Sequence, residues 1–387
     1  MTDKIIRGAG GPPPTPPPPF RAPDTLNSRQ FASIQDLISE GEIEGFATPS
    51  KAGLSKGSTA YNNAALKDIF LNDTPILNAS ASNTNPQTAD FNFQNVGFTP
   101  RFGTSNQTHV PGIEGSQSTT AVGVTVTNSS PVTRQITNTA VDAAKVTITF
   151  PQLQKATDEG DLLGSSVNLK IQVQYNSGGF TDVINDTITG RTADAYQKEY
   201  RVSFTGSFPV DIRVVRVTAD SSSSNLVDAF TWTSISEIVD DKQTYPNSAY
   251  TNLRIDSEQF SSIPKRAFRI RGVKVRIPGA GASNSGTPTV DLQTGRIIYP
   301  SGYIFNGTMG AAQWCSCPSL ILLDLLTTER YGFGTHITDS NLDLFSFIAA
   351  SKYANELVDD GFGGQEARFS CNVNIQGSTE AFTLINE

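Results

Sequence analysis

Apolar and polar residues alternate along six short stretches of the chain between Val122 and Val239. A period of two places successive side chains on opposite faces of a β-strand, so that one face can be buried and the other solvated. The stretches read VGVTVT, KVTITF, VNLKIQVQY, YRVSF, VDIRVVRV and FTWTSISEI, and the glycine-containing YNSGGF at the end of the third is typical of a hairpin. Many short strands separated by turns predict a β-sandwich or barrel here.

Further strands are expected on both sides of this region. LKDIFLNDTPIL, residues 66–77, predicts two strands joined by a turn at Asn72 and Asp73. After Pro246, LRIDSEQF and then RAFRIRGVKVRIP, residues 266–278, predict more strands. The last of these has one charged face, formed by Arg269, Arg271, Lys274 and Arg276. Such a face favours contact with solvent or with another subunit, and a nucleic-acid stripe is the alternative.

The N-terminal part combines a proline-rich run with a short apolar segment. Seven prolines lie between Pro12 and Pro19, and consecutive prolines enforce an extended polyproline II rod of about 3.1 Å per residue. Such a rod builds no core, so it is either a disordered tail or an arm that reaches a neighbouring subunit. In the following SRQFASIQDLISE we expect one or two helical turns, which Gly41 and Gly45 end.

The C-terminal part changes to a helical pattern. A helix is expected over residues 318–329, since Pro318 suits the first helical position. A second helix is expected to begin at Thr338 or Asp339 and to end at Gly361, with DGFGGQE as its cap and a tight turn. Its apolar face is expected to consist of Leu342, Phe345, Ile348, Ala349 and Tyr353. RFSCNVNIQ predicts a last strand, and GSTEAFTLINE begins a further amphipathic helix where the chain stops. We therefore expect a fragment of a longer protein or the product of a split gene.

Composition and charge narrow the possible functions. Hydrophobic residues make up 37% of the 387 residues, which is low for one large core and favours several small β domains with long connections. The net charge of −8 does not supply the phosphate-neutralising surface that nucleic-acid binding needs. Neither a run of about 18 apolar residues nor the apolar core of a signal peptide occurs. We therefore expect no membrane insertion, and synthesis in a cytoplasm.

Residue types that carry catalytic or metal chemistry are sparse. Only two histidines occur, His109 and His336, and no phosphate loop or hydrolase motif is found. Cys315 and Cys317 have one residue between them, fewer than the two to four between the cysteines of zinc sites. With Cys371 they make an odd count, which argues against a disulfide framework. We interpret the three cysteines as thiols of a reduced protein.

A dense group of carboxylates lies in SEIVDDKQTYPNSAYTNLRIDSEQF, residues 236–260. Asp256 and Glu258 are two apart, so on a strand they would share one face and could act as acid and base or ligate calcium. The commoner outcome is pairing with the basic residues of 266–278. The other acids, which precede a Tyr-Pro-Asn turn, are Glu237, Asp240 and Asp241. We assign no catalytic, cofactor-binding or metal-ligating residue and expect no cofactor and no enzymatic activity.

Six phrases resemble one family in the same order: LISEGEIEG, IFLNDTPIL, TWTSISEIVDDKQTYPNSAY, IDSEQF, LTTERYGFG and DGFGGQEARFSCN. Together they resemble the N-terminal part of the tail tip protein J family of lambda-like siphophages, also called host-specificity or central tail fibre proteins. The resemblance runs from near Ile34 to Glu387 and is strongest over residues 232–260 and 326–372. A proline-rich arm stands where the family has a short Gly-, Ser- and Lys-rich start, and family members continue well beyond the last residue of this chain.

The resemblance implies a mainly β fold with some α-helix, in which small β-barrel hub domains carry an inserted β-sandwich. We expect a proline-rich arm (1–27), a discontinuous hub β domain with a loop-rich insertion (28–120 and 240–310), the inserted sandwich (121–239) and an α+β hub domain (311–387). Three copies would form a trimeric hub at the distal end of the phage tail. This hub would close the tail tube and carry the central fibre used in host recognition and DNA ejection.

The resemblance also implies partners. They are two further copies of the chain, the distal tail or tail tip proteins and the C-terminal end of the tape measure protein, with the host receptor contacting regions beyond Glu387. The acids of 236–260 would then pair with basic residues across domain or subunit joints. An alternative function is a carbohydrate-binding module, in which the sandwich contacts host surface sugars through aromatic residues that look exposed: Phe180, Tyr196 and Phe208.

Overall fold

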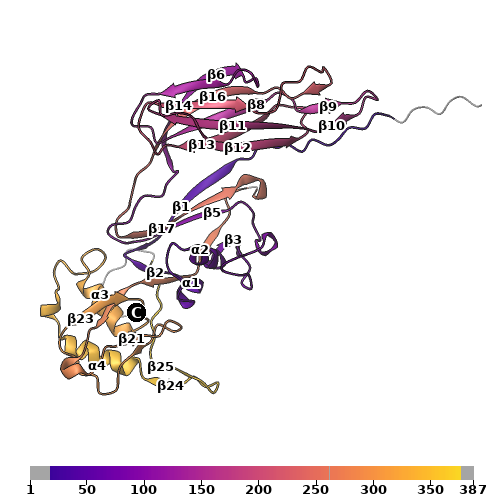
Figure 1. Cartoon of the computed structure of the whole chain (residues 1–387). Helices are drawn as coiled ribbons and strands as arrows, with labels where there is room; N and C mark the ends of the chain where they lie inside the picture. Colours follow the sequence, from indigo (N-terminus) through magenta and orange to yellow (C-terminus); the bar gives the residue numbers. More distant parts are fainter. Residues whose placement is uncertain (1–17, 261, 376–387) are drawn as a thin grey trace, which may run out of the picture. The chain divides into compact units, whose positions relative to one another are not determined.

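The computed structural model describes residues 18–260 and 262–375 (Figure 1). Antiparallel strands form most of its regular structure. The expected class, mainly β with some α-helix, is therefore confirmed. The described residues form two compact units: unit 1 combines the chain up to residue 29 with residues 112–241, and unit 2 combines residues 30–111 with those from 242 onwards. The finer division into four domains stays a prediction.

In the part of unit 1 that the structure describes, all of the regular secondary structure consists of β-strands. They are β6 (Glu114–Thr125), β7 (Val132–Ile136), β8 (Ala143–Phe150), β9 (Gln154–Ala156), β10 (Leu162–Leu163), β11 (Ser165–Tyr175), β12 (Thr181–Gly190), β13 (Tyr196–Ser203), β14 (Val210–Arg216), β15 (Leu226–Val227) and β16 (Thr231–Asp240). The predicted alternating stretches coincide with β8, β11, β13, β14 and β16, whereas β6 begins earlier than predicted and ends within VGVTVT.

Two four-stranded antiparallel sheets enclose the core of unit 1. One has the order β12-β11-β14-β7 and the other β13-β8-β16-β6, with a small third sheet of order β10-β9-β15. Inward side chains from both sheets, such as Ile148, Leu169, Val214 and Trp232, are completely buried in one cluster. Because each such side chain contributes roughly 1.5–3 kcal/mol on burial, the alternation of apolar residues stabilises the packing of the two sheets.

The described end of the expected proline-rich arm lies along unit 1. The amide of Ala22 donates to the carbonyl of Leu162 at 2.8 Å, and Arg191 pairs with Asp24 at 2.7 Å. These contacts add a short extended segment beside β10. Residues 1–17, which include most of the proline run, lie outside the described residues, as does the amphipathic helix expected within the last eleven residues.

Unit 2 is a mixture of short strands and helices. Its strands are β1 (Phe31–Glu40), β2 (Ile43–Phe46), β3 (Ile69–Leu71), β4 (Thr74–Pro75), β5 (Gly97–Phe102), β17 (Ser248–Asp256), β18 (Arg266–Phe268), β19 (Ile270–Val273), β20 (Val275–Pro278), β21 (Thr289–Val290), β22 (Ile297–Ile298), β23 (Met309–Gln313), β24 (Leu357–Asp359) and β25 (Gln365–Ala367). Its α-helices are α1 (Ala47–Lys51), α2 (Thr59–Ala65), α3 (Pro318–Thr327) and α4 (Leu344–Ala354). Short 3₁₀ turns are η1 (Leu66–Asp68), η2 (Thr88–Asp90), η3 (Ser257–Gln259), η4 (Ala282–Asn284) and η5 (Asp339–Asn341).

The strands of unit 2 form sheets of two or three strands around two cores. The first core surrounds Phe46, Tyr61 and Ile69, and the second, against which α3 and α4 pack, surrounds Ile277 and Leu320. The sheet orders are β1-β17-β5, β18-β3-β4, β19-β2, β20-β23, β21-β22 and β24-β25. None of these sheets, within the residues that the structure describes, closes into the small barrel expected for a hub domain, because most have too few strands to curl onto themselves.

Two predicted helical features of unit 2 were wrong. The segment expected to form helical turns before Gly41 is strand β1, which pairs antiparallel with β17 from Phe31 opposite Asp256 to Glu40 opposite Ser248. An isolated turn of helix is marginal in water, so pairing with a distant strand overrides local propensity. The expected helix after Thr338 begins only at Leu344, capped by Asp343, and ends at Ala354.

The apolar face of that helix also differs from the prediction. Ile348 is buried, whereas Phe345 and Tyr353 are more than half exposed. The buried stripe instead continues through Ser351 and Ala354. The shift leaves two large aromatic side chains of α4 on the surface of unit 2.

Candidate functional site

The acid-rich stretch at 236–260 contains the passage of the chain from unit 1 to unit 2. Strand β16 ends at Asp240 in unit 1, and β17 begins at Ser248 in unit 2. Glu237 lies in β16, opposite Ser118 of β6. The Asp240 carboxylate is 2.7 Å from the guanidinium of Arg201 and its side chain is 11% exposed. The acid at the end of unit 1 is therefore held in an ion pair on the sandwich itself.

A left-handed turn leads the chain back into unit 2. Tyr245 and Asn247 have φ values of 44° and 59°, a region that asparagine tolerates better than most residues. The side-chain amide nitrogen of Gln107 lies within 3.0 Å of the carbonyl oxygens of Thr244, Tyr245 and Ser248. One side chain therefore fixes the predicted Tyr-Pro-Asn turn from outside.

Asp256 and Glu258 do not share a strand face, so that expectation was wrong. Asp256 is the last residue of β17 and is 1% exposed, whereas Glu258 lies in the 3₁₀ turn η3. The Asp256 carboxylate accepts from the backbone N–H of Glu258 and from the side-chain amide of Asn95, each at 3.1 Å. These bonds are typical of a capping residue and give Asp256 a structural role. The neighbouring acid of the first group, Asp241, donates its amide to the carbonyl of Ile113 at 2.8 Å.

The basic segment 266–278 divides into β18, β19 and β20, and its cations pair with acids from distant segments of unit 2. The pairs are Arg266–Asp36 at 2.6 Å, Arg269–Asp68 at 2.6 Å, Arg276–Asp339 at 2.7 Å and Lys274–Glu42. Pairing of this segment with the acids of 236–260 was predicted, whereas the acids of these four pairs lie elsewhere in unit 2. Each pair ties the segment to a neighbouring part of unit 2.

Asp68 is the most buried acid in these pairs, with no exposed surface. It accepts from the backbone N–H of Thr48 at 2.5 Å, from the Thr48 hydroxyl at 2.8 Å and from the Nε of Arg269 at 2.7 Å. A buried carboxylate is tolerated only when its oxygens are hydrogen-bonded in this way. Arg269 thus connects β18 and β19 to the start of α1.

Arg271 differs from its neighbours because it is 2% exposed and its guanidinium donates to a backbone carbonyl, that of Leu292. Its guanidinium lies 4.3 Å from the ring centroid of Trp314, a cation–π contact. Burial lowers the pKa of Arg271 from its ordinary value. The residue joins β19 to the β21–β22 hairpin region and to the segment before α3.

The pKa values of two aspartates near α3 are shifted in opposite directions. Hydrogen bonds from Arg276 hold the pKa of Asp339 below its ordinary value. Burial raises the pKa of Asp324, although Tyr331 donates to its carboxylate at 2.6 Å. Tyr331 in turn has a raised pKa because of burial. The Asp324–Tyr331 pair lies beside Gly41, whose position would bring a Cβ within 3.1 Å of the Tyr331 ring, so it fills a packed joint within unit 2.

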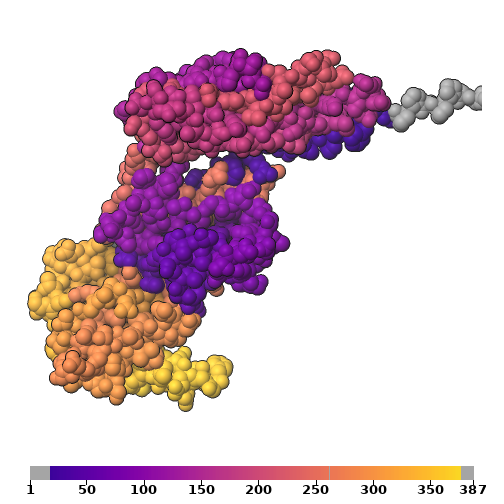
Figure 2. All heavy atoms as spheres, in the orientation of Figure 1, coloured from indigo at the N-terminus to yellow at the C-terminus, as the bar shows by residue number. Residues whose placement is uncertain are grey.

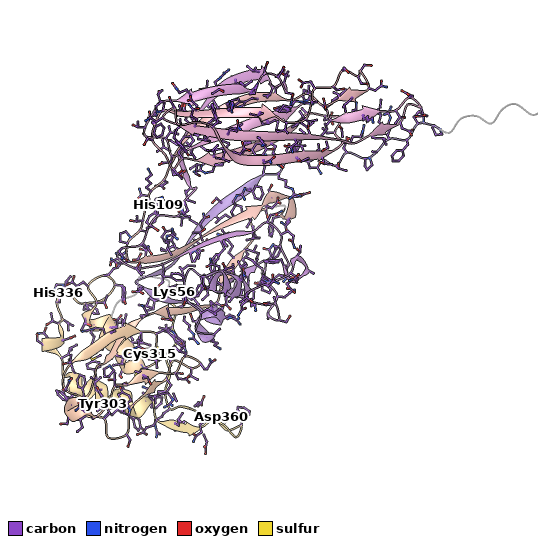
Figure 3. All side chains as sticks on the ribbon, in the orientation of Figure 1. Lys56, His109, Tyr303, Cys315, His336 and Asp360 are labelled. Carbon is purple, nitrogen blue, oxygen red and sulfur yellow. The ribbon has the colours of Figure 1, made fainter. Side chains whose placement is uncertain are left out.

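The cysteines and histidines do not assemble into a site. Cys315 and Cys317 are buried, and burial raises the pKa of Cys315 to about 12, so its thiol stays protonated at neutral pH. Cys371 is held nearby through its amide, which donates to the carbonyl of Ser316 at 2.8 Å. Figure 3 shows His109 and His336 on separate parts of the chain. Among residues 18–260 and 262–375, no group of three His, Cys, Asp or Glu side chains could hold a metal ion.

The aromatic residues that motivated a carbohydrate-binding module are not exposed, which corrects the expectation from sequence. Tyr196 is 9% exposed and belongs to the sandwich core. Phe208 packs against that core and against Phe204, with ring centroids 5.9 Å apart. The Arg213 guanidinium covers Phe180 at 3.8 Å from the ring centroid. These side chains therefore offer no exposed platform on which a sugar ring could stack.

Two pockets of unit 2 were not predicted from the sequence, and one loop was assigned to the wrong element. A pocket of about 430 Å³ is lined by Tyr299, Tyr303 and Lys352, and another of about 450 Å³ by Lys56, Phe98 and Phe102, among others. The loop is the DGFGG segment, which forms the tip of a β24–β25 hairpin instead of a helix cap. Its closely spaced glycines beside an aspartate are a turn signal that could have suggested a hairpin.

Known proteins similar to this chain identify its family. The family model described as "Tip attachment protein J, FNIII-A domain" matches residues 116–241. The tip attachment protein J of Escherichia phage SECphi4 is 30% identical over 384 residues, which cover 99% of this chain and 31% of that protein. The protein of the same name from Escherichia phage SECphi27 is 28% identical over 389 residues, or 100% of this chain and 29% of that protein. The chain thus spans about a third of the length of these curated relatives.

Solved structures add nothing to this likeness. The CBM22-1 xylan-binding domain of Paenibacillus barcinonensis Xyn10C covers 38% of this chain and 87% of that domain, at 8% identity and a TM-score of 0.19. A TM-score this low supports neither a shared fold nor a shared ligand. In the described part of the chain, no helix combines the length and the apolar character needed to cross a membrane.

The names of the relatives agree with the expected place of the chain at the tip of a phage tail. The ordered phrases of the sequence had predicted this family, and the similarity over nearly the whole chain confirms it. The chain is a homologue of tip attachment protein J, and its residues 116–241 form an FNIII-A domain of that family.

Proposed function

We propose that this chain is a structural component of a phage tail tip, in which three copies form a hub that closes the distal end of the tail tube and carries the central fibre. The observation that carries the proposal is the similarity to tip attachment protein J along 99% of the chain. Host recognition and DNA ejection then depend on the assembled tip, with the receptor contacting protein beyond Glu387.

The proposed partners are two further copies of the chain, the distal tail or tail tip proteins and the C-terminal end of the tape measure protein. Unit 2 supports such a role because its ion pairs tie segments far apart in sequence, for example Asp36 to Arg266. These cross-links hold distant segments of unit 2 together, which supports a structural role. Unit 1, an all-β insertion, then provides a second surface of the same chain.

The proposed role is non-enzymatic. Asp256, one of the two acids that a hydrolase could use here, caps η3, and Asp240 of the same stretch pairs with Arg201. Replacing Asp256 or Pro246 is expected to reduce the yield of assembled tails. Neither substitution is expected to affect an enzymatic step. Counting tails by electron microscopy after complementation of a defective phage checks this. Normal tail yield from both variants would contradict the structural role of this stretch.

The trimer is tested by mass. Light scattering on the purified chain, or on tails that contain it, is expected to show three copies of the 41.5 kDa chain. A chain that stays monomeric in solution and is present as one copy in tails would overturn the proposal.

A further inference from the structure

A hairpin in unit 2 presents one phenylalanine to solvent. Strands β24 and β25 form a two-stranded sheet of their own among the described residues, and their loop carries Phe362, whose side chain is 97% exposed. Figures 1 and 2 show this yellow hairpin standing clear of the rest of unit 2. Figure 3 labels Asp360 on it. Phenylalanine is enriched where proteins meet, so the tip is a candidate anchor for a partner.

The tip is held in one conformation before any partner binds. The Asp360 carboxylate accepts from the backbone N–H groups of Phe362 at 2.8 Å and of Gly364 at 2.9 Å. Gly361 and Gly363 have φ values of 77° and 90°, which other residues adopt only with strain. A loop fixed in advance loses little conformational entropy on binding. The base of the hairpin is also fixed, because the amide of Phe369 donates to the carbonyl of Ala354 at 3.0 Å.

The hairpin is acidic. Residues 356–368 contain one base, Arg368, and four acids: Glu356, Asp359, Asp360 and Glu366. Arg368 pairs with Glu356 at 2.8 Å. The three other carboxylates lie close to the tip, so the anchor carries negative charge around an apolar side chain. A fitting partner surface is therefore apolar at its centre and basic at its rim.

Unit 2 contains a pocket of that chemistry. It encloses about 450 Å³, and its lining includes the rings of Phe98 and Phe102, the side chain of Pro100 and the cations Lys56 and Arg101, with no carboxylate in the lining. The Lys56 ammonium lies 4.6 Å from the Phe102 ring centroid. The pocket thus offers an aromatic floor for a phenyl ring and positive charge for the acids around it.

The hydrogen bonds of Arg101 run to backbone carbonyls, which do not neutralise its positive charge as a carboxylate would. Its guanidinium donates to the carbonyl of Thr108 at 2.5 Å and to that of His109. Figure 3 labels Lys56 and Asp360 on different parts of unit 2. The acidic tip and the basic pocket are therefore two separate surfaces of one chain.

We propose that the Phe362 hairpin of one copy docks into the Lys56–Phe98–Phe102 pocket of a second copy. This inference rests on the proposed trimer, because contact between two different surfaces of one chain closes into a ring when the rotation between copies is right. Phe362 supplies the buried anchor, and the acids beside it meet Lys56 and Arg101. The remaining contacts between copies then need only exclude water from this centre.

A photo-cross-linking residue at position 362 tests the contact in the full chain. Irradiation is expected to give cross-links between copies, with mass spectrometry placing them in residues 56–62 or 98–108. The same residue at position 345 is the matched control, since Phe345 is also a phenylalanine of unit 2 and is 60% exposed; it should give no link to those residues. A trimer whose position 362 links elsewhere overturns the docking but leaves the proposed function intact. Absence of any oligomer, in solution and in tails, overturns the proposed function itself.

Exchange of charges provides a second test that does not depend on Phe362. Lys56→Glu and Asp359→Lys are each expected to weaken association about tenfold or more, and the double variant should regain most of the loss. Lys265→Glu is the control, because its side chain is 74% exposed and outside the pocket. Unfolding midpoints equal to that of the unsubstituted chain show that the variants fold. A double variant no stronger than the single variants contradicts the proposal.

Discussion

Unit 1 encloses one core between two four-stranded sheets, whereas unit 2 divides its strands among small sheets around two cores. In unit 1, long strands bury alternate side chains, and Trp232 belongs to the core cluster with no exposed surface. In unit 2, most strands have six residues or fewer, and ion pairs such as Arg269–Asp68 and Arg276–Asp339 join distant segments.

This difference shows two ways to specify a β structure. Unit 1 depends on apolar area, which is non-directional and spread over many residues. Unit 2 has little area per sheet and depends on directional contacts, each made by a few side chains. Substitutions in the core should therefore damage unit 1 most, and substitutions of single polar side chains should damage unit 2 most.

The largest loss of stability is expected from removing the fully buried Trp232 side chain of unit 1. Trp232→Ala should lower the free energy of unfolding of unit 1 by about 3–5 kcal/mol, because it leaves a cavity among fully buried neighbours. Denaturant unfolding measures the loss, and hydrogen exchange with mass spectrometry assigns it to residues 112–241. Val183→Ala, at a site 46% exposed in the same unit, is the control. Equal loss of protection in both units would show that they do not have separate cores.

A smaller effect is expected from removing the buried acid of unit 2. Asp68→Ala should cost unit 2 about 1–3 kcal/mol, since the N–H of Thr48 and the guanidinium of Arg269 lose their acceptor. Hydrogen exchange should rise around α1 and β19 and stay unchanged in unit 1. Asp73→Ala provides the comparison, because that side chain is 78% exposed and 3.7 Å from its cation. If both substitutions lower the free energy of unfolding equally, buried ion pairs and hydrogen bonds are not what distinguishes unit 2 from unit 1.

The return turn of unit 2 is expected to be sensitive to one side chain. Gln107→Ala should cost about 1 kcal/mol and speed exchange in residues 244–250, because the amide that reaches three carbonyls is lost. Gln107→Glu keeps the shape but removes the donors, so it should be at least as harmful. A stable Gln107→Glu variant would mean that packing rather than hydrogen bonding holds the turn.

The smallest effect concerns pH. Arg276 lowers the pKa of Asp339 in unit 2. In unit 1, partial burial opposes ionisation of Asp186, yet hydrogen bonds from Lys198 and Tyr200 leave its pKa lowered as well. A carboxyl with a lowered folded pKa stabilises the fold above its unfolded pKa, and this stability is lost as pH falls through the folded pKa. Both units should therefore weaken below the ordinary aspartate value of 3.8.

Single substitutions separate the two contributions to that pH dependence. Asp339→Asn should reduce the loss of stability at low pH in unit 2 alone. Asp186→Asn should reduce that loss in unit 1 alone. Thermal unfolding followed between pH 3 and pH 7 provides the measurement. A change in the wrong unit would mean that the pKa shifts do not report on local stability.

The sequence revealed most of unit 1 because its signal is local. In β11 and β14, every second residue is buried, so the pattern is visible without knowing the partner strand. The same reasoning failed for β1, whose pairing with β17 joins Phe31 to Asp256 across the whole inserted unit. Its edge position leaves Leu37 exposed, which removed the clean alternation that would have marked a strand.

The candidate site was less predictable because charge partners are set by topology. The basic segment was expected to pair with the nearer acids Asp256 and Glu258. Its observed partners Asp36, Asp68 and Asp339 could not be identified without the strand order. The DGFGG loop was assigned to a helix end because α4 was expected to run longer than it does. Its role as a hairpin tip depends on β24, which is only three residues long and gives almost no periodic signal.

Cryo-electron microscopy of tails that contain this chain tests the central claim most directly. We expect threefold density at the distal end of the tail tube, with unit 2 of each copy in the closed ring and the Phe362 hairpin of one copy against the Phe98 pocket of the next. Density for a single copy, or for this chain anywhere other than the tail tip, would contradict it.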